Sequence, residues 1–161
     1  MDTPSQHAIS LLSALAITSD RIHEFGYSLF LQTGAASWSS TRSHRISLSG
    51  SPFRIHKSET VEQFDRSLGI GVWLDRTANS GCIIFAVDIA YRSSGWFVQS
   101  NVEDEDNQRT RLLWNSEEYW ADTLDDALRS LEQATEMLIQ SPTFPTVAAV
   151  LEEIRRETNN A

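Results

Sequence analysis

The stretch Cys82-Ile-Ile-Phe-Ala-Val-Asp-Ile-Ala-Tyr91 decides the fold of this chain. Every second residue from Ile83 to Tyr91 is large and apolar, and Asp88 falls between them. A period of two places alternate side chains on one face of a β-strand. The sequence therefore predicts a long strand with one apolar face and with Asp88 on the other face.

Turn-forming residues lie on both sides of this strand, and further alternating segments follow them. Arg76 to Gly81 is rich in Asn, Ser and Gly, and Arg92 to Gly95 is a tight polar turn. Short alternating strands joined by short turns form antiparallel sheets. The alternation predicts one shared face for each of three sets of residues: Ile70, Val72 and Leu74; Trp96, Val98, Ser100 and Val102; and Thr110, Leu112 and Trp114.

The chain between residues 34 and 68 has a weaker pattern. Residues 34 to 45 are small, polar and aperiodic, which predicts a loop. Ile46–Leu48 and Phe53–Ile55 flank Gly-Ser-Pro and predict two short strands around a turn. Residues 60 to 68 fit either a helical turn or a connecting loop.

A helix is predicted at the N-terminus. Thr3 is a good N-cap, Pro4 suits the first helical position, and Ala8, Leu11, Leu12 and Leu15 recur at helical spacing. The same period continues to Leu29, so we expect one long helix that ends near Gly34. The alternative is a break at Ser19-Asp20 followed by a strand.

Two more helices are predicted after the strands. Either Asp122 or Thr123 can cap a helix whose apolar stripe runs from Leu124 to Leu138, and Ser141-Pro142 ends it. Pro145 opens a last helix with apolar residues at i, i+3, i+4 and i+7 from Val147.

The order of these elements predicts the fold class. With 161 residues and 40% hydrophobic residues, the chain is long and apolar enough for one domain over residues 1–161. We expect an α+β fold, in which an antiparallel β-sheet meander carries an N-terminal helix and two C-terminal helices packed on one face.

The charge of the chain is concentrated in one segment. The net charge is −9, and residues 101 to 136 hold eleven acids and three bases, which sum to −8. Binding to nucleic-acid phosphates or to an anionic membrane needs a basic surface, so we expect neither. Ile9 to Ile17 is apolar and contains Ala14-Leu15-Ala16, as a secretory signal does, but no Lys or Arg precedes it and Ser10 and Ser13 interrupt it, so we expect no such signal. With one cysteine, Cys82, and no membrane-spanning stretch, we expect the cytoplasm.

No catalytic, cofactor or metal motif stands out. Gly69-Ile-Gly71 lacks the third glycine of a dinucleotide fingerprint, and one cysteine cannot build a zinc site of the usual kind. The four histidines, His7, His23, His44 and His56, are scattered and read as surface or hydrogen-bonded residues. The sequence thus predicts no enzyme activity, no cofactor and no metal site.

Two acidic clusters are the candidate binding residues. The first, at a predicted hairpin tip, consists of Glu103, Asp104, Glu105 and Asp106, and the second, in a predicted connection, consists of Glu117, Glu118, Tyr119, Trp120 and Asp122. Aromatic rings among acids suit an interface with a basic protein, in which the acids steer and the rings anchor. The alternatives are a solvated hairpin tip and rings that fold under the helix. The clusters should lie toward opposite ends of one strand, roughly 20 Å apart.

In style, residues 68 to 140 resemble the immunity proteins encoded beside bacterial polymorphic toxins. The resemblance rests on long hairpin strands, the pair Leu113-Trp114 and the helix that begins at Thr123. It implies a cytoplasmic protein that binds a toxin domain, often a basic nuclease, and occludes its site.

The sequence therefore predicts a non-catalytic protein-binding module, an immunity-type inhibitor of a basic partner. The alternative is a small-molecule-binding or enzymatic domain, with a pocket between sheet and helices lined by Trp73, Phe85, Trp96 and Trp114. A homo-oligomeric structural subunit is a third reading, and the oligomeric state stays open.

Overall fold

A computed structural model describes residues 3–42, 53–57, 64–76, 81–106 and 109–160. An N-terminal helix is followed by the strands of one antiparallel sheet and then by two helices, which confirms the α+β class. The elements are α1 (Pro4–Thr33), β1 (Ser37–Ser40), β2 (Phe53–Lys57), β3 (Phe64–Asp75), β4 (Cys82–Arg92), β5 (Gly95–Glu105), β6 (Thr110–Asn115), β7 (Tyr119–Ala121), α2 (Leu124–Gln140), the short 3₁₀ turn η1 (Ser141–Thr143) and α3 (Pro145–Asn159).

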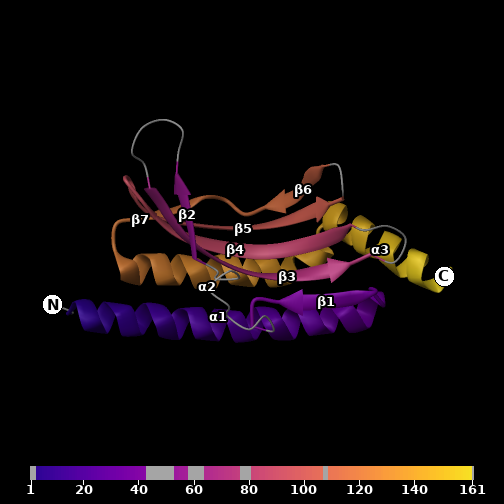
Figure 1. Cartoon of the computed structure of the whole chain (residues 1–161), viewed down its shortest axis with the longest axis horizontal. Coiled ribbons are helices and arrows are strands. Elements are labelled where there is room, and N and C mark those ends of the chain that lie inside the picture. Colours follow the sequence, from indigo (N-terminus) through magenta and orange to yellow (C-terminus); the bar gives the residue numbers. More distant parts are fainter. Residues whose placement is uncertain (1–2, 43–52, 58–63, 77–80, 107–108, 161) are drawn as a thin grey trace.

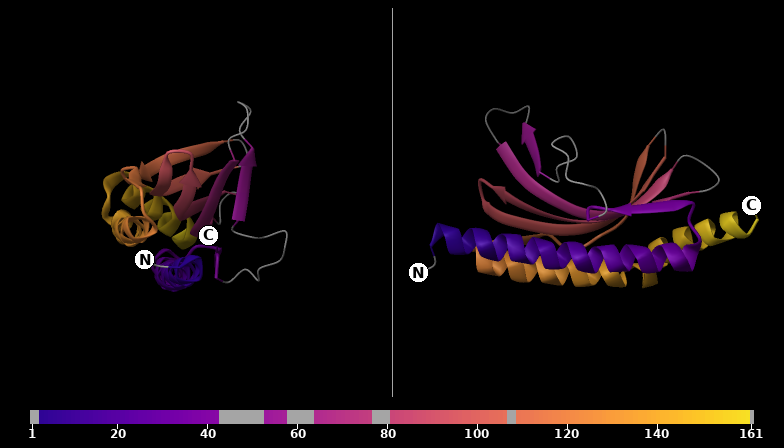
Figure 2. Two further views of the ribbon diagram at one scale, coloured as in Figure 1. Left: turned by 90° about the vertical axis from the view of Figure 1, so that its left-hand side faces the viewer. Right: turned by 60° about the horizontal axis from the view of Figure 1, so that its bottom comes forward.

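The sheet has the strand order β1-β3-β4-β5-β6, and every pair is antiparallel. β2 also pairs with β3, and β7 pairs with β5 beyond the end of β6. All three helices lie on the same face of the sheet (Figure 1). The strand ends curve away from the helices, so the opposite face is concave (Figure 2). No described helix covers that face, which is called the open face below.

The core lies between the sheet and the helix layer. On β4 the predicted face is confirmed for Ile83, Phe85, Val87 and Ile89, which are all at most 2% exposed. Tyr91 is the exception, since it is 54% exposed and contacts Trp96 near the hairpin turn. The helices bury Ile22 and Leu29 of α1, Leu131 and Leu138 of α2, and Val147 and Ile154 of α3 against the sheet.

The N-terminal helix is continuous, as predicted, and no break occurs at Ser19-Asp20. The Thr3 side chain and Gln6 form a reciprocal capping box, and Gly34 ends the helix with φ 66°. Gly26 lies inside the helix because β3 approaches closely there. A Cβ on Gly26 would stand 2.6 Å from Cγ2 of Val72.

The helix starts and stops after the sheet also agree with the prediction. Thr123 is the N-cap of α2, because its hydroxyl accepts a hydrogen bond from the backbone N–H of Asp126. Asp122, the other option, is exposed. The predicted apolar stripes of α2 and α3 face the core. The described helices include none that is long and apolar enough to cross a membrane.

Three predictions about the strands were wrong. Ser37–Ser40 forms β1 inside the predicted loop, because it pairs with β3 and Trp38 packs on Phe30 of α1. β3 begins at Phe64, so part of the region predicted as a helical turn or loop is strand. β7 lies within the predicted connection. The predicted strand Ile46–Leu48 falls outside the described residues.

A fourth correction concerns β6, where Leu112 and Trp114 do not share a face. Trp114 pairs with Val102, whereas Leu112 pairs with Glu103, so the register shifts by one residue between them. A bulge of this kind turns the following side chains to the other face. Leu112 is therefore 53% exposed on the open face, and Leu113 is buried.

Gly26→Ala should destabilise the protein, although alanine is the better helix former. The added methyl group meets Val72, which is fully buried and stiff at χ1, so it cannot move aside. Overpacking outweighs the helix propensity gain of about 1 kcal/mol, and we expect a net loss of about 1 to 2 kcal/mol. Urea unfolding measures this. Ser13→Ala, at an exposed position of the same helix, is the control and should leave the midpoint unchanged or higher.

Candidate partner-binding surface

The register of the three central strands determines which residues line the open face. Since the odd-numbered residues of β4 face the helices, Ile84, Ala86 and Asp88 face the other way. Their partners lie on the same face. They are Trp73, Gly71 and Gly69 on β3, and Glu103, Asn101 and Gln99 on β5.

The first acidic cluster is mostly strand, not a hairpin tip as predicted. Glu103, Asp104 and Glu105 extend β5, so alternation sends them to different faces. Glu103 and Glu105 lie on the open face, and Asp104 lies on the helix side. Asp106 closes the hairpin, since its Oδ1 accepts a hydrogen bond from the backbone N–H of Arg109 at 3.0 Å.

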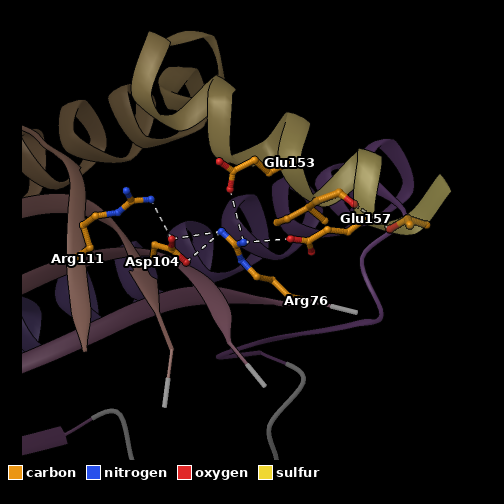
Figure 3. A network of polar contacts seen from close by, with 7 residues as sticks. Arg76, Asp104, Arg111, Glu153 and Glu157 are labelled. Atoms are coloured by element: carbon orange, nitrogen blue, oxygen red, sulfur yellow. Dashed lines mark hydrogen bonds and ion pairs between the residues drawn. The ribbon is translucent and has the colours of Figure 1, made fainter. Parts of the chain in front are cut away.

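Asp104 is held in an ion-pair network that joins the sheet to α3 (Figure 3). Nη2 of Arg76 donates to both Asp104 oxygens at 3.2 Å, and Arg111 contacts the same carboxylate at 3.1 Å. Nη1 of Arg76 reaches Glu157 at 3.3 Å and Glu153 at 3.6 Å. The Arg76 side chain is only 9% exposed and that of Asp104 17%. The charge of Asp104 is therefore neutralised inside the protein.

Arg76→Met should cost about 3 kcal/mol of unfolding free energy. Removing the guanidinium leaves Glu157 partly buried without its cation and leaves Asp104 only the exposed Arg111, which costs more than an exposed pair is worth. Arg111→Met is the matched control. Its side chain is 57% exposed, so the expected loss is within about 0.5 kcal/mol. Denaturant unfolding of both variants measures the difference, and equal losses would contradict this assignment.

The second cluster is organised by β7 and the sheet edge. Ser116 precedes β7 and binds β5 twice, since its N–H donates to the Ser100 carbonyl and its Oγ accepts from the Ser100 N–H. β7 then pairs with Trp96–Val98. Glu117, Glu118 and Asp122 are exposed on either side of this strand.

The two aromatic residues of β7 point in opposite directions. Tyr119 pairs with Val98 and is half-buried on the helix side, where burial, followed by the charge of Glu117, raises the pKa of its phenol. Trp120 is 46% exposed on the open face. Its Nε1–H donates to Oε2 of Glu118 at 3.3 Å, and its ring centroid lies 5.0 Å from that of Phe97.

Phe97 and Arg92, which the sequence prediction missed, complete this end of the open face. The Arg92 guanidinium carbon lies 4.2 Å from the Phe97 ring centroid and 6.0 Å from the Trp120 ring. A cation over an aromatic face is attracted by the ring quadrupole. The alternation of β5 could have predicted this position for Phe97, because Trp96, Val98 and Ser100 face the helices and Phe97 lies between them.

The two clusters contribute to one face but do not form one patch. Phe97 and Glu105 are eight residues apart on β5, or about 26 Å at the rise of a strand. Between them the open face carries small residues such as Gly71 and Ala86, and Trp73 and Ile84 lie nearer the acidic end, where Ile84 pairs with Glu103. The open face thus has an acidic end with Leu112, and an aromatic end with Trp120.

Cys82 lies on the open face between Asp75 on β3 and Glu105 on β5. Burial raises the pKa of its thiol from 9.0 to about 11, and the charges of Glu105, Asp75 and Asp104 add to this in that order. The protonated thiol is thus favoured by folding. That contribution to stability is complete below about pH 9 and is lost as the pH rises through 11.

The raised pKa predicts an unreactive thiol. At pH 8 the folded protein should react with a disulfide reagent roughly a hundredfold more slowly than the unfolded chain, because the thiolate is the nucleophile. Glu105→Gln should speed the reaction of the folded protein, since Glu105 is the carboxylate whose charge raises the thiol pKa most. Equal rates for folded and unfolded protein would contradict the assigned pKa.

The aromatic pocket of the alternative reading does not form. Phe85 is fully buried in the core, whereas Trp73 lies on the opposite face of the sheet. Trp114 packs on Phe144, on the helix side. His23 has a structural contact, since its Nδ1 lies 2.7 Å from Oγ of Ser40. Within the described ranges, no three His, Cys, Asp or Glu side chains converge as metal ligands.

Comparisons with known proteins add no relative, since no family model, no curated protein and no solved structure matches this chain.

Proposed function

We propose that this protein is a non-catalytic binding module that inhibits a basic partner protein held against the open face of its sheet. The observation that carries the proposal is Trp120, a large ring left 46% exposed beside Glu118 on a face without a helix. Tryptophan is the residue most often found as an energetic anchor of protein interfaces.

The charges of the open face and its edge support a basic partner. Glu103, Glu105, Glu117 and Glu118 form no ion pair with any other described residue. Such carboxylates attract a cationic surface and raise its association rate. Asp104 is left out of the proposed surface, because Arg76 and Arg111 already neutralise it. Tyr119 supports the surface from the helix side.

The proposed inhibition follows from the resemblance to immunity proteins, which bind a toxin domain and cover its site. An inhibitor needs to cover a site of its target, and a concave face with an anchor at one end and acids at the other fits a convex basic surface. The proposed setting is the bacterial cytoplasm, where a free thiol such as Cys82 remains reduced.

Neutralising the acidic end should slow partner binding. The protein is used as bait in an extract of the cells that make it, and the basic proteins captured are purified and measured kinetically. For Glu103→Gln with Glu105→Gln, we expect the association rate to fall several-fold at low salt, and the wild-type rate to fall with ionic strength. Trp120→Ala should instead raise the dissociation rate, with about a tenfold loss of affinity.

Asp126→Asn with Glu152→Gln is the matched control, because it removes the same charge from the helix layer. The control should bind like the wild type. If the control and the open-face variant weaken binding equally, only net charge matters and the proposed surface is wrong. If no basic protein is captured, or the captured protein keeps its activity, the inhibitory function is wrong.

A further inference from the structure

A surface groove runs along the seam between α1 and α2, on the side of the molecule away from the open face. One part, of about 590 Å³, is lined by Ala14, Ile17, Leu128 and Leu131, together with polar side chains. The next part, of about 470 Å³, is lined by Phe25, Leu29, Ile139 and Pro142, again with polar side chains. Arg21 borders both parts, and its ion pair with Glu136 crosses between them.

The groove has the length of a short helix. Its lining on α2 and η1 extends from Asp125 to Pro142, which is about 26 Å at the helical rise. The apolar lining includes an exposed side chain of α1, since Ile17 is 62% exposed. Exposed apolar residues along a helical groove are the usual receptor for an amphipathic helix.

The charges along the groove favour a bound helix with basic side chains. Glu132, Asp125 and Glu24 line the groove and form no ion pair with another described residue. The arginines beside them are already engaged, Arg21 by Glu136 and Arg129 by Asp126. A bound helix with Lys or Arg beside its apolar stripe would pair with the free carboxylates.

A second copy of this chain fits the groove poorly. α1 and α2 together carry six acids and two arginines, a net charge of −4. A symmetric dimer through this seam would bring two such surfaces together, and like charges in contact oppose association. The charge pattern thus favours a partner over self-association.

We propose that the α1–α2 groove is a second interaction surface, which takes an amphipathic helix with basic flanks from a partner protein. This site shares no residue with the open face and does not depend on the function proposed for that face.

The probe that tests this is a fluorescent synthetic peptide of about 18 residues, with leucine at i, i+3, i+4 and i+7 and lysine elsewhere. A peptide of the same composition, with leucines spread around the helix, serves as the reference. Fluorescence anisotropy with the full-length protein should show that the striped peptide binds at least tenfold more tightly than the reference.

Substitutions then locate the binding site. Ile17→Asn should weaken striped-peptide binding about tenfold, and Glu132→Gln about threefold. Ile9→Asn and Glu152→Gln are the matched controls, exposed and outside the groove lining, and should leave it unchanged. The open-face variant Glu103→Gln with Glu105→Gln should also bind the peptide normally, which separates this test from that of the proposed function. Thermal melting confirms that each variant is folded.

Four outcomes would overturn the proposal. These are a striped-peptide Kd weaker than about 1 mM, equal binding of the two peptides, and an Ile9→Asn loss as large as that of Ile17→Asn. The fourth is a dimer, seen by light scattering, that Ile17→Asn dissociates, because a second copy would then occupy the groove.

Discussion

Burial of one face of the sheet against the helix layer is the constraint on which the rest of the structure depends. On β4, Ile83, Phe85 and Val87 lose almost all solvent contact, and Phe25 of α1 packs edge-on against Phe85 at 5.4 Å. Full burial of one such side chain contributes about 1.5 to 3 kcal/mol. Because successive side chains alternate, this burial also determines what faces outward. The residues of the open face are thus the other half of the alternating pattern that forms the core.

Periodic segments with clear caps could be predicted from the sequence. The helical spacing of apolar residues was sufficient to predict α1, and the alternation was sufficient to predict β4, because each pattern is local. The errors involve pairing that is not local. β1 is a strand only because β3 lies beside Ser37–Ser40, and the shift at Leu113 depends on how β6 meets β5. The residues of β1 and β6 do not show with which strand, or in which register, each segment pairs. Local propensity alone therefore predicts a loop at Ser37–Ser40 and an unbroken alternation along β6.

The candidate site shows the same division. The acidic run was read as a loop because charged residues are common in turns, whereas β5 continues through Glu105. Once it is strand, alternation separates Asp104 from its neighbours and directs it to Arg76, a residue far away in the sequence. Extending the alternation from Trp96 to Val102 by three residues would have predicted the strand and the face of Asp104. No sequence pattern predicts which of Tyr119 and Trp120 is exposed, since this depends on the pairing of β7 with β5.

The negative charge of residues 101 to 136 is divided between two surfaces. Glu103 and Glu105 belong to the sheet and Glu118 directly precedes β7, whereas Asp125 and Glu132 belong to α2 and line the groove. A sheet and a helix layer separate the two sides by roughly 20 Å, which exceeds the Debye length of about 8 Å at physiological salt. Charges on one surface therefore contribute little to steering at the other. A partner that uses both surfaces must present separate basic segments, one for the open face and one helix for the groove, linked by enough chain to pass around the edge of the sheet.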